Sequence, residues 1–250
     1  MADGSLYLYG IIDDNKVDTT SCSGIKGASV RVLRENRVAA VISDAPSGRL
    51  RPRRKNLKAH HDTLRHLAHA TAVLPMAFGV LAESEDEVAT FLADHEKTLA
   101  EQLDAVRDHV EITLRIRWDV DDIFDYFVGR YDELREMRNA FFGDGASASR
   151  REMIQLGEQF DAFLQAERET HLSVLLEHLD PVCRAVEVQD PKDEKEVMNL
   201  ACLVPKDGEE AFEDAVHTAA ESFADEFLFK YTDSMAPYSF ADVAFEGEEA

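Results

Sequence analysis

Four histidines lie close together between residues 60 and 69, in a segment whose apolar spacing predicts a helix: His60, His61, His66 and His69. On a helix, Asp62, His66 and His69 fall near one face, at positions i, i+4 and i+7. Carboxylate and imidazole groups in that arrangement are able to hold zinc or nickel. No ligand from another segment follows at a characteristic spacing, so the pattern favours a structural or solvated role, and we expect no metal or other cofactor.

His61 is expected on the buried face of this helix, beside Leu57, Leu64 and Ala68. A buried imidazole needs a hydrogen-bond partner for each ring nitrogen, so a buried structural histidine is the default. Catalysis would need an activated partner, and the sequence shows neither a Ser or Cys nucleophile in a recognisable elbow nor a phosphate-binding loop. The sequence therefore predicts that the protein is not an enzyme. A metal-binding enzyme that uses the histidine-rich helix stays open as an alternative.

The spacing of apolar residues predicts the elements that position these side chains. In chain order they are strands at 5–12, 28–33 and 38–43, helices at 56–71 and from Ser84, a strand at 110–118, helices at 120–142 and 149–179 with a break at Gly143-Asp144-Gly145, strands at 183–189 and 196–204, a helix from Asp207 with an apolar stripe to Phe227, and a strand at 228–231. From residue 108 this order is typical of a ferredoxin-like split βαβ plan. We therefore expect an α+β protein with two domains, an N-terminal α+β domain at 1–107 and a C-terminal ferredoxin-like domain with an inserted helical arm at 108–250.

Charge and cysteine content narrow the classes of partner and compartment. The sequence has 27 lysines and arginines against 50 aspartates and glutamates, a formal net charge of −23, which argues against a general affinity for nucleic acid or a lipid membrane. Its longest apolar run, Ala72–Ala82, is too short to span a bilayer, and its first residues lack a signal-peptide layout. Cys22, Cys183 and Cys202 are far apart, so we expect no disulfide framework and a cytoplasmic location.

Two segments are candidates for binding a partner. Positive charge is concentrated between Arg49 and Lys58, with Arg51, Arg53, Arg54 and Lys55 as the principal candidates. A solvated loop explains such charges equally well, whereas the functional interpretation is a docking patch for an acidic surface. The predicted helical arm is rich in aromatic residues, of which Phe124, Phe127 and Tyr131 are the second set of candidates. Core packing is the commoner cause of such a cluster, but aromatic residues also anchor interfaces.

Three short motifs occur in order along the chain. The first is Tyr7-x-Tyr9-Gly10, the second is Leu74-Pro75-x-x-Phe78-Gly79, and the third is Pro237-Tyr238-x-Phe240. Pro75 has no N–H for a sheet ladder and restricts Leu74 to extended geometry, so the second motif predicts a bend or a sheet edge. With a histidine at position 60 or 61 between the first two, these motifs resemble the GvpF/GvpL family of gas vesicle proteins. The chain departs from the family at Asp233-Ser234-Met235-Ala236, where members usually carry Gly-Pro-Trp.

The resemblance implies a non-enzymatic accessory or minor structural protein of gas vesicles. Such a protein is expected to bind the gas vesicle shell protein and to assist the nucleation and assembly of the vesicle, with other gas vesicle accessory proteins as further partners. The resemblance implies no cofactor, and it places the protein in the cytoplasm, at the gas vesicle. A homo-oligomerising regulatory module whose sheets pair edge to edge stays open as another alternative.

Overall fold

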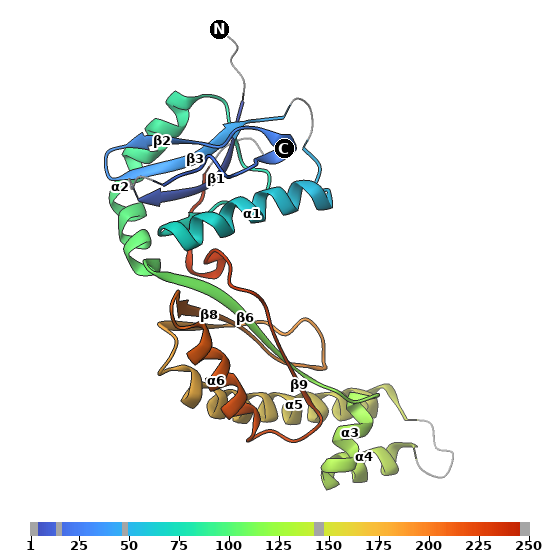
Figure 1. Cartoon of the computed structure of the whole chain (residues 1–250). Coiled ribbons are helices and arrows are strands. Elements are labelled where there is room, and N and C mark those ends of the chain that lie inside the picture. The colour runs from blue at the N-terminus through green and yellow to red at the C-terminus, as the bar shows by residue number, and fades with distance from the viewer. Residues whose placement is uncertain (1–4, 14–16, 47–49, 143–147, 246–250) are drawn as a thin grey trace. The chain divides into compact units, whose positions relative to one another are not determined.

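The structure is a computed structural model that describes residues 5–13, 17–46, 50–142 and 148–245 (Figure 1). The chain forms two compact units. The first unit combines Met1–Ile112 with Leu203–Glu209 and Asp233–Ala250, and the second combines Thr113–Cys202 with Glu210–Thr232. A division into folding domains at residue 107 stays a prediction, since the first unit also draws on two segments from beyond that residue.

The first unit is built around an antiparallel sheet in the order β2-β3-β1-β4, with β5 also paired to β1. Its elements are β1 (Leu6–Asp13), the 3₁₀ turn η1 (Ile25–Gly27), β2 (Arg31–Glu35), β3 (Val38–Asp44), α1 (Arg54–Ala70), β4 (Val73–Pro75), β5 (Leu81–Ala82), α2 (Glu85–Val106) and the 3₁₀ turn η3 (Tyr238–Phe240). The elements predicted for this half of the chain are confirmed: three strands between residues 5 and 44 and two helices.

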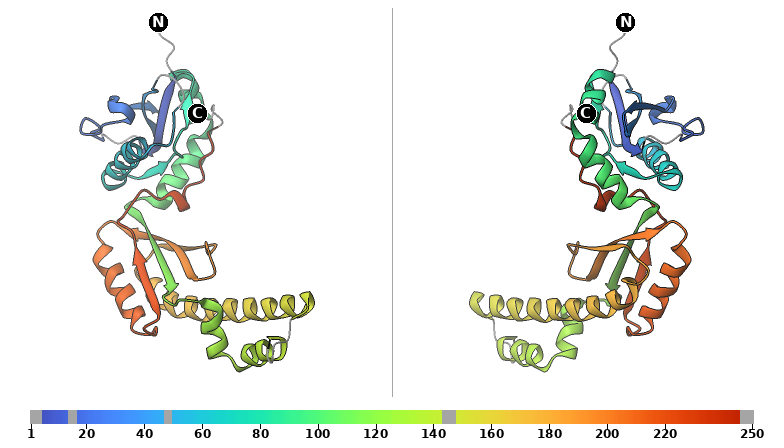
Figure 2. Two further views of the ribbon diagram at one scale, coloured as in Figure 1. Left: turned by 90° about the vertical axis from the view of Figure 1, so that its right-hand side faces the viewer. Right: turned by 90° about the vertical axis from the view of Figure 1, so that its left-hand side faces the viewer.

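Strand β1 is the centre of the first unit and is buried on both faces. Leu6 and Leu8 point into a core cluster shared with α2, whereas Tyr7 and Tyr9 point into a second cluster shared with α1. The sheet register shifts between Leu8 and Gly10. Because such a bulge adds one residue, it exchanges the two faces of the strand beyond that point. The sheet therefore lies between α1 and α2, one helix on each face (Figure 2).

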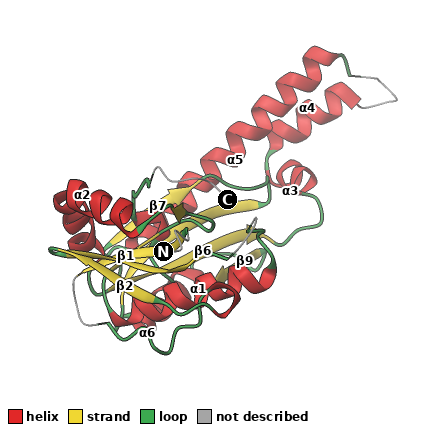
Figure 3. Cartoon of the chain, turned by 90° about the horizontal axis from the view of Figure 1, so that it is seen from above, coloured by secondary structure: helices red, strands yellow, loops and turns green. Residues whose placement is uncertain are grey.

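The second unit contains most of a four-stranded sheet in the order β7-β8-β6-β9. Its elements are β6 (His109–Trp118), α3 (Ile123–Arg130), α4 (Asp132–Phe142), α5 (Arg150–Leu179), β7 (Ala185–Gln189), β8 (Glu196–Pro205), α6 (Glu209–Ala220) and β9 (Phe227–Tyr231). The strand predicted at 110–118 is confirmed as β6, and its even-numbered residues from Val110 to Trp118 are all buried, although Glu111 on the opposite face is buried as well. Helix α4 lies alongside the N-terminal part of α5 (Figures 2 and 3).

The α+β class is confirmed, and two details of the prediction are wrong. The helix expected at 120–142 is interrupted at Tyr131, whose backbone is extended and whose ring stacks on Phe163 of α5. Helix α6 ends at Ala220, so Phe223 and Phe227 lie beyond it and pack instead against the His171 ring. The break predicted at Gly143-Asp144-Gly145 lies outside the described residues. The ferredoxin-like plan stays a prediction.

Candidate functional site

The histidine on the buried face of α1 is His60. The prediction that His61 lies on this face is wrong. The His60 side chain is completely buried, whereas His61 is exposed. The buried face of the helix begins at Asn56, whose side-chain amide donates to the Arg51 carbonyl oxygen at 3.0 Å. Four residues on from Asn56, the same face carries His60. The prediction failed because it followed only the apolar residues, while this face starts with two polar ones.

Both ring nitrogens of His60 have partners. Nδ1 lies 2.9 Å from the Tyr7 hydroxyl, and Nε2 lies 3.2 Å from the Met76 carbonyl oxygen and 3.1 Å from the Tyr238 hydroxyl. A carbonyl oxygen only accepts hydrogen bonds, so Nε2 carries the proton and Nδ1 accepts from Tyr7. In the neutral imidazole, these partners select a single tautomer.

The three sequence motifs meet at this imidazole. The Tyr7 hydroxyl of the first motif also accepts a hydrogen bond from the Gly79 N–H of the second, at 3.2 Å. Gly79 has φ +102°, a backbone conformation that side chains disfavour, and Phe78 beside it places its ring centroid 5.8 Å from that of His60. Tyr238 brings in the third motif through Nε2 of His60. Residues far apart in sequence thus share one hydrogen-bonded cluster.

The remaining motif residues support this cluster. Gly10 pairs with Pro75, and Leu74 is fully buried beside them. The Tyr9 hydroxyl accepts from the Ile25 N–H at 2.9 Å and lies 3.1 Å from the Ser43 hydroxyl. Pro237 is buried, and Phe240 packs against the core cluster on the α2 side. The divergent segment 233–236 places Met235 in a bridge with Glu111 and buries Ala236.

The chemistry of the cluster is that of a structural core. Burial, together with a smaller contribution from the neighbouring His61, lowers the pKa of His60 to about 4. Burial also raises the pKa values of Tyr7, Tyr9 and Tyr238. At neutral pH the imidazole is a weak base enclosed by weak acids, and it has no exposed surface on which a substrate could approach. The cluster therefore joins secondary-structure elements around a fully enclosed imidazole.

The metal arrangement suggested by Asp62, His66 and His69 is not assembled. The Asp62 carboxylate pairs with Lys58 at 2.5 Å and with Arg65 at 3.2 Å. The Nε2 atom of His66 lies 3.0 Å from the Asp18 carbonyl oxygen. Across the residues that the structure describes, no three His, Cys, Asp or Glu side chains are grouped as a metal ion requires.

The cationic candidates Arg51, Arg53, Arg54 and Lys55 are exposed at the start of α1. Within the described part of the chain none of these four side chains has an ion-pair partner, whereas Lys58 pairs with Asp62. Arg49, at the start of the same basic run, lies outside the described residues. The structure thus presents four cationic side chains together on a strongly acidic protein.

The aromatic candidates of the helical arm are used for internal packing. Phe127 is completely buried against Trp118 and Phe160, so its assignment as a surface anchor is wrong. Phe124 is half-buried, with its ring centroid 5.4 Å from that of Phe160. Tyr131 stacks on Phe163 at 4.2 Å. The packing of α3 against α5 explains why this part of the arm is rich in aromatic residues.

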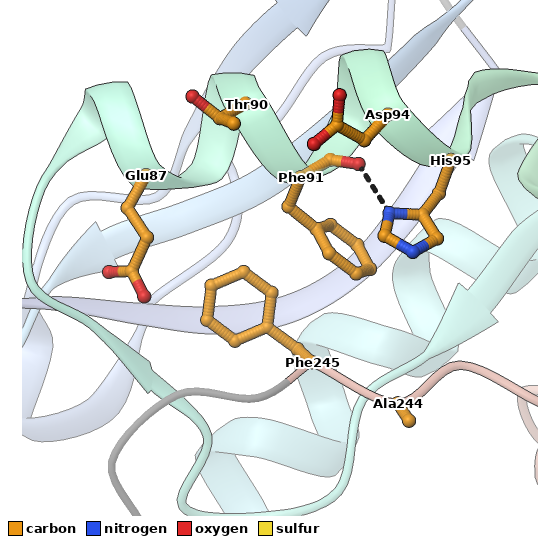
Figure 4. Close-up of a pocket in the computed structure, with 7 residues that line it drawn as sticks. All are labelled: Glu87, Thr90, Phe91, Asp94, His95, Ala244 and Phe245. Atoms are coloured by element: carbon orange, nitrogen blue, oxygen red, sulfur yellow. Dashed lines mark hydrogen bonds between the residues drawn. The ribbon is translucent and has the colours of Figure 1, made fainter.

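An open groove that the sequence did not predict lies between α2 and residues 244–245 (Figure 4). Its volume is about 740 Å³, and it is lined by Glu87, Thr90, Phe91, Asp94, His95, Ala244 and Phe245. The Phe91 and Phe245 rings meet edge to face at 4.9 Å, and His95 donates through Nδ1 to the Phe91 carbonyl oxygen at 3.0 Å. The available signal was Phe91 itself, a large apolar residue outside the buried stripe of this helix, which consists of Val88, Leu92, Leu99, Ala100, Leu103 and Val106.

Apolar side chains are also exposed on the helical arm. Phe142 is 47% exposed, and Met153 and Ile154 are each 50% exposed. Met153 continues the apolar spacing of Leu156 and Phe160 in the sequence, yet it is exposed, because the covered stripe of α5 begins at Leu156. No helix within the described ranges is both long enough and apolar enough to cross a membrane.

Comparison with known proteins identifies relatives over nearly the whole chain. The model of the family described as "Gas vesicle synthesis protein GvpL/GvpF" matches residues 5–242. Gas vesicle protein F of Streptomyces sp. (strain CB03234) is 28% identical over 95% of this chain and 100% of its own length. Gas vesicle protein L1 of Halobacterium salinarum (strain ATCC 700922 / JCM 11081 / NRC-1) is 26% identical over 94% of this chain and 89% of its own length.

Comparison with solved structures identifies the same family. The crystal structure of the gas vesicle protein GvpF from Anabaena sp. PCC7120 superposes with a TM-score of 0.82 at 25% identity, over 97% of this chain and 100% of that chain. The GvpF structure from Microcystis aeruginosa, at 24% identity, shares the fold with a TM-score of 0.83 over 96% and 99% of the two chains. The family predicted from three short motifs is thus confirmed by sequence and by fold. This chain belongs to the GvpL/GvpF family of gas vesicle proteins.

Proposed function

We propose that this gas vesicle-associated protein is a non-enzymatic accessory or minor structural component, located in the cytoplasm at the gas vesicle, which binds the shell subunit and assists nucleation and assembly. A subunit that will line a gas space exposes apolar surface before it assembles, and such surface aggregates unless it is covered. A partner with a net charge of −23 keeps the covered subunit dispersed by charge repulsion.

The aromatic groove is the observation that carries this proposal. Phe91 and Phe245 are only partly buried, and their rings form an apolar floor on the surface of the first unit (Figure 4). The carboxylates of Glu87 and Asp94 lie at its rim. An apolar floor with a polar rim is the usual composition of a protein-binding surface. The groove therefore supplies the apolar contact that the buried aromatic residues of the arm do not.

The exposed cations Arg51, Arg53 and Arg54 supply a secondary contact. Their charges are surrounded by water, so they speed up the encounter with an acidic surface more than they stabilise the complex. Salt screens such contacts, with a Debye length of about 3 Å at 1 M, whereas apolar contacts persist. The two contributions are therefore separable by salt concentration.

Capture of purified shell subunit, measured at low and at high salt, tests the proposal. Wild type is expected to retain the shell subunit in both conditions. The variant Arg51/Arg53/Arg54→Glu should capture less at low salt and match wild type at high salt. Phe245→Ser should capture less in both conditions, because the groove loses half of its aromatic floor.

Phe142→Ser is the matched control, since it removes an exposed phenylalanine from α4 instead of the groove. Thermal melting of each variant shows whether the fold is retained. Capture that disappears for wild type in high salt eliminates the apolar groove as the main contact. The absence of capture under any condition removes the proposed function itself.

A further inference from the structure

The N-terminal part of α5 carries an exposed face that no described segment covers. Arg150, Ile154, Gly157 and Asp161 are all exposed and lie at spacings of four, three and four residues. That spacing places the four side chains along one line of the helix, as in a coiled-coil seam. We call this line the α5 seam. Gly157 and Asp161 directly follow the buried residues Leu156 and Phe160, so the seam lies about 100° around the helix from the buried stripe.

Gly157 is the first unusual feature of the α5 seam. It lies inside a helix of 30 residues, and a Cβ atom built on it would meet nothing within 4 Å. Glycine in a helix interior costs about 1 kcal/mol relative to alanine, and the intramolecular packing here gives no reason for that cost. A residue without a side chain leaves a gap in the helix surface, which suits the close approach of a side chain from another molecule.

Ile154 is the second unusual feature, because it is a β-branched apolar residue with half of its surface in water. It lies one turn before Gly157. Two copies of α5 placed antiparallel, with the midpoint between residues 155 and 156, bring Ile154 of each copy against Gly157 of the other. In the same register Arg150 of each copy faces Asp161 of the other. The seam is thus complementary to itself in both size and charge.

We propose that the α5 seam is a dimerisation surface, on which two copies of this chain pack their α5 helices antiparallel about a two-fold axis. An isologous interface requires that every contact occur twice, and both pairs do so, Ile154 with Gly157 and Arg150 with Asp161. Met153, also half exposed, lies at the flank of the same contact. The α5 seam is only three helical turns long, so the interface is small and the dimer dissociates readily on dilution.

Sedimentation of the full chain from the micromolar to the millimolar range, at moderate salt that screens the repulsion between two acidic chains, tests for the dimer. Wild type is expected to show a reversible monomer–dimer equilibrium. Gly157→Leu, which fills the gap, and Ile154→Arg, which removes the apolar contact, should each weaken the dimer by about tenfold or more. Ala162→Leu is the matched control, because position 162 is exposed on α5 away from the α5 seam. It should leave the equilibrium unchanged.

Charge exchange provides the sharper test. Arg150→Asp places two acidic residues on each seam, and Asp161→Arg places two basic residues there, so each variant alone should be monomeric. A mixture of the two variants should dimerise again, because each acidic residue now faces a basic one. A misfolded variant cannot give that recovery. Wild type that stays monomeric throughout, a dimer insensitive to the exchanges, or a mixture that fails to recover would each overturn the proposal.

Discussion

The Tyr7 hydroxyl donates to Nδ1 of His60 across 2.9 Å, in the interior of the first unit. Tyr7 lies on the central strand β1, and His60 lies on the helix α1 that covers one face of the sheet. A hydrogen bond between two buried side chains is specific, because a shift of the helix along the strand would separate them and leave a buried polar group unsatisfied. The pair therefore fixes the position of α1 on the sheet.

Replacement of His60 by leucine is expected to lower the free energy of unfolding by about 2–6 kcal/mol. The Tyr7 hydroxyl and the Met76 carbonyl oxygen would both lose a buried partner, at about 1–3 kcal/mol each. Denaturant titration measures the loss. His61→Leu is the matched control, since that neighbouring side chain is exposed and its change should stay within about 0.5 kcal/mol. Equal effects for the two variants would contradict the structural role of His60.

Stability is expected to fall as the pH is lowered from about 6.5 to about 4, because of His60. Its pKa in the folded protein is about 4, against an ordinary value of 6.5, since burial disfavours the imidazolium. Between these values the unfolded chain binds a proton that the folded chain does not, so acid favours unfolding. The full pKa shift corresponds to a loss of about 3 kcal/mol in the free energy of unfolding.

The measurement is the free energy of unfolding against pH for wild type and for His60→Gln, which has no imidazole to titrate. The difference between the two curves isolates this histidine from the carboxylates that titrate in the same range. The difference should shrink as the pH falls through this window. A constant difference would show that His60 is not held neutral by the fold.

Gly79→Ala and Gly129→Ala are expected to change stability in opposite directions. A Cβ atom at either position would meet nothing within 4 Å, so contacts do not decide the outcome. Gly79 has φ +102°, where a side chain strains the backbone, and its replacement should cost about 1–3 kcal/mol. Gly129 lies in α3, where alanine is the better helix former by about 1 kcal/mol. Melting temperatures that move together would refute the conformational explanation.

Gly10→Ala is expected to destabilise the fold for a different reason, namely space. A Cβ atom on Gly10 would lie 2.8 Å from the Leu74 carbonyl oxygen and 3.1 Å from the Val73 side chain. The backbone oxygen cannot move without disturbing the pairing of β1 with β4, so a loss of about 1–3 kcal/mol is expected. The double variant Gly10→Ala/Val73→Ala, which also shortens the neighbouring Val73 side chain, should restore little of the lost stability. Full recovery in the double variant would show that only side chains were in conflict.

Elements with a regular pattern were predictable from sequence. The sequence of β6 alternates between apolar and polar residues from Val110 to Trp118, and α2 follows Ser84, whose hydroxyl accepts from the Glu87 N–H as is typical of an N-cap serine. The interruption at Tyr131 was not predicted, because its local signal is only Gly129 two residues earlier, and the stacking of Tyr131 on Phe163 forms only in the folded chain. Local spacing therefore identifies elements, whereas tertiary packing decides where some of them end.

The candidate site was predictable in its motifs but not in its centre. Tyr7, Gly79 and Tyr238 were recognised as conspicuous residues, yet nothing local shows that they converge on His60. That convergence depends on contacts between residues 178 positions apart in the case of His60 and Tyr238. The aromatic groove was missed for the same reason, because Phe91 and Phe245 come together only in the folded chain.

The return of residues 233–245 to the first unit has a consequence for synthesis on the ribosome. Met1–Ile112 emerge first, but Tyr238, which completes the partners of His60, follows only after the entire second unit. At about 5–20 residues per second, the early segment waits on the order of ten seconds for its last contacts. A nascent chain that terminates early thus leaves β1 and α1 without their final contacts. The first unit is therefore completed only after the whole second unit has been synthesised.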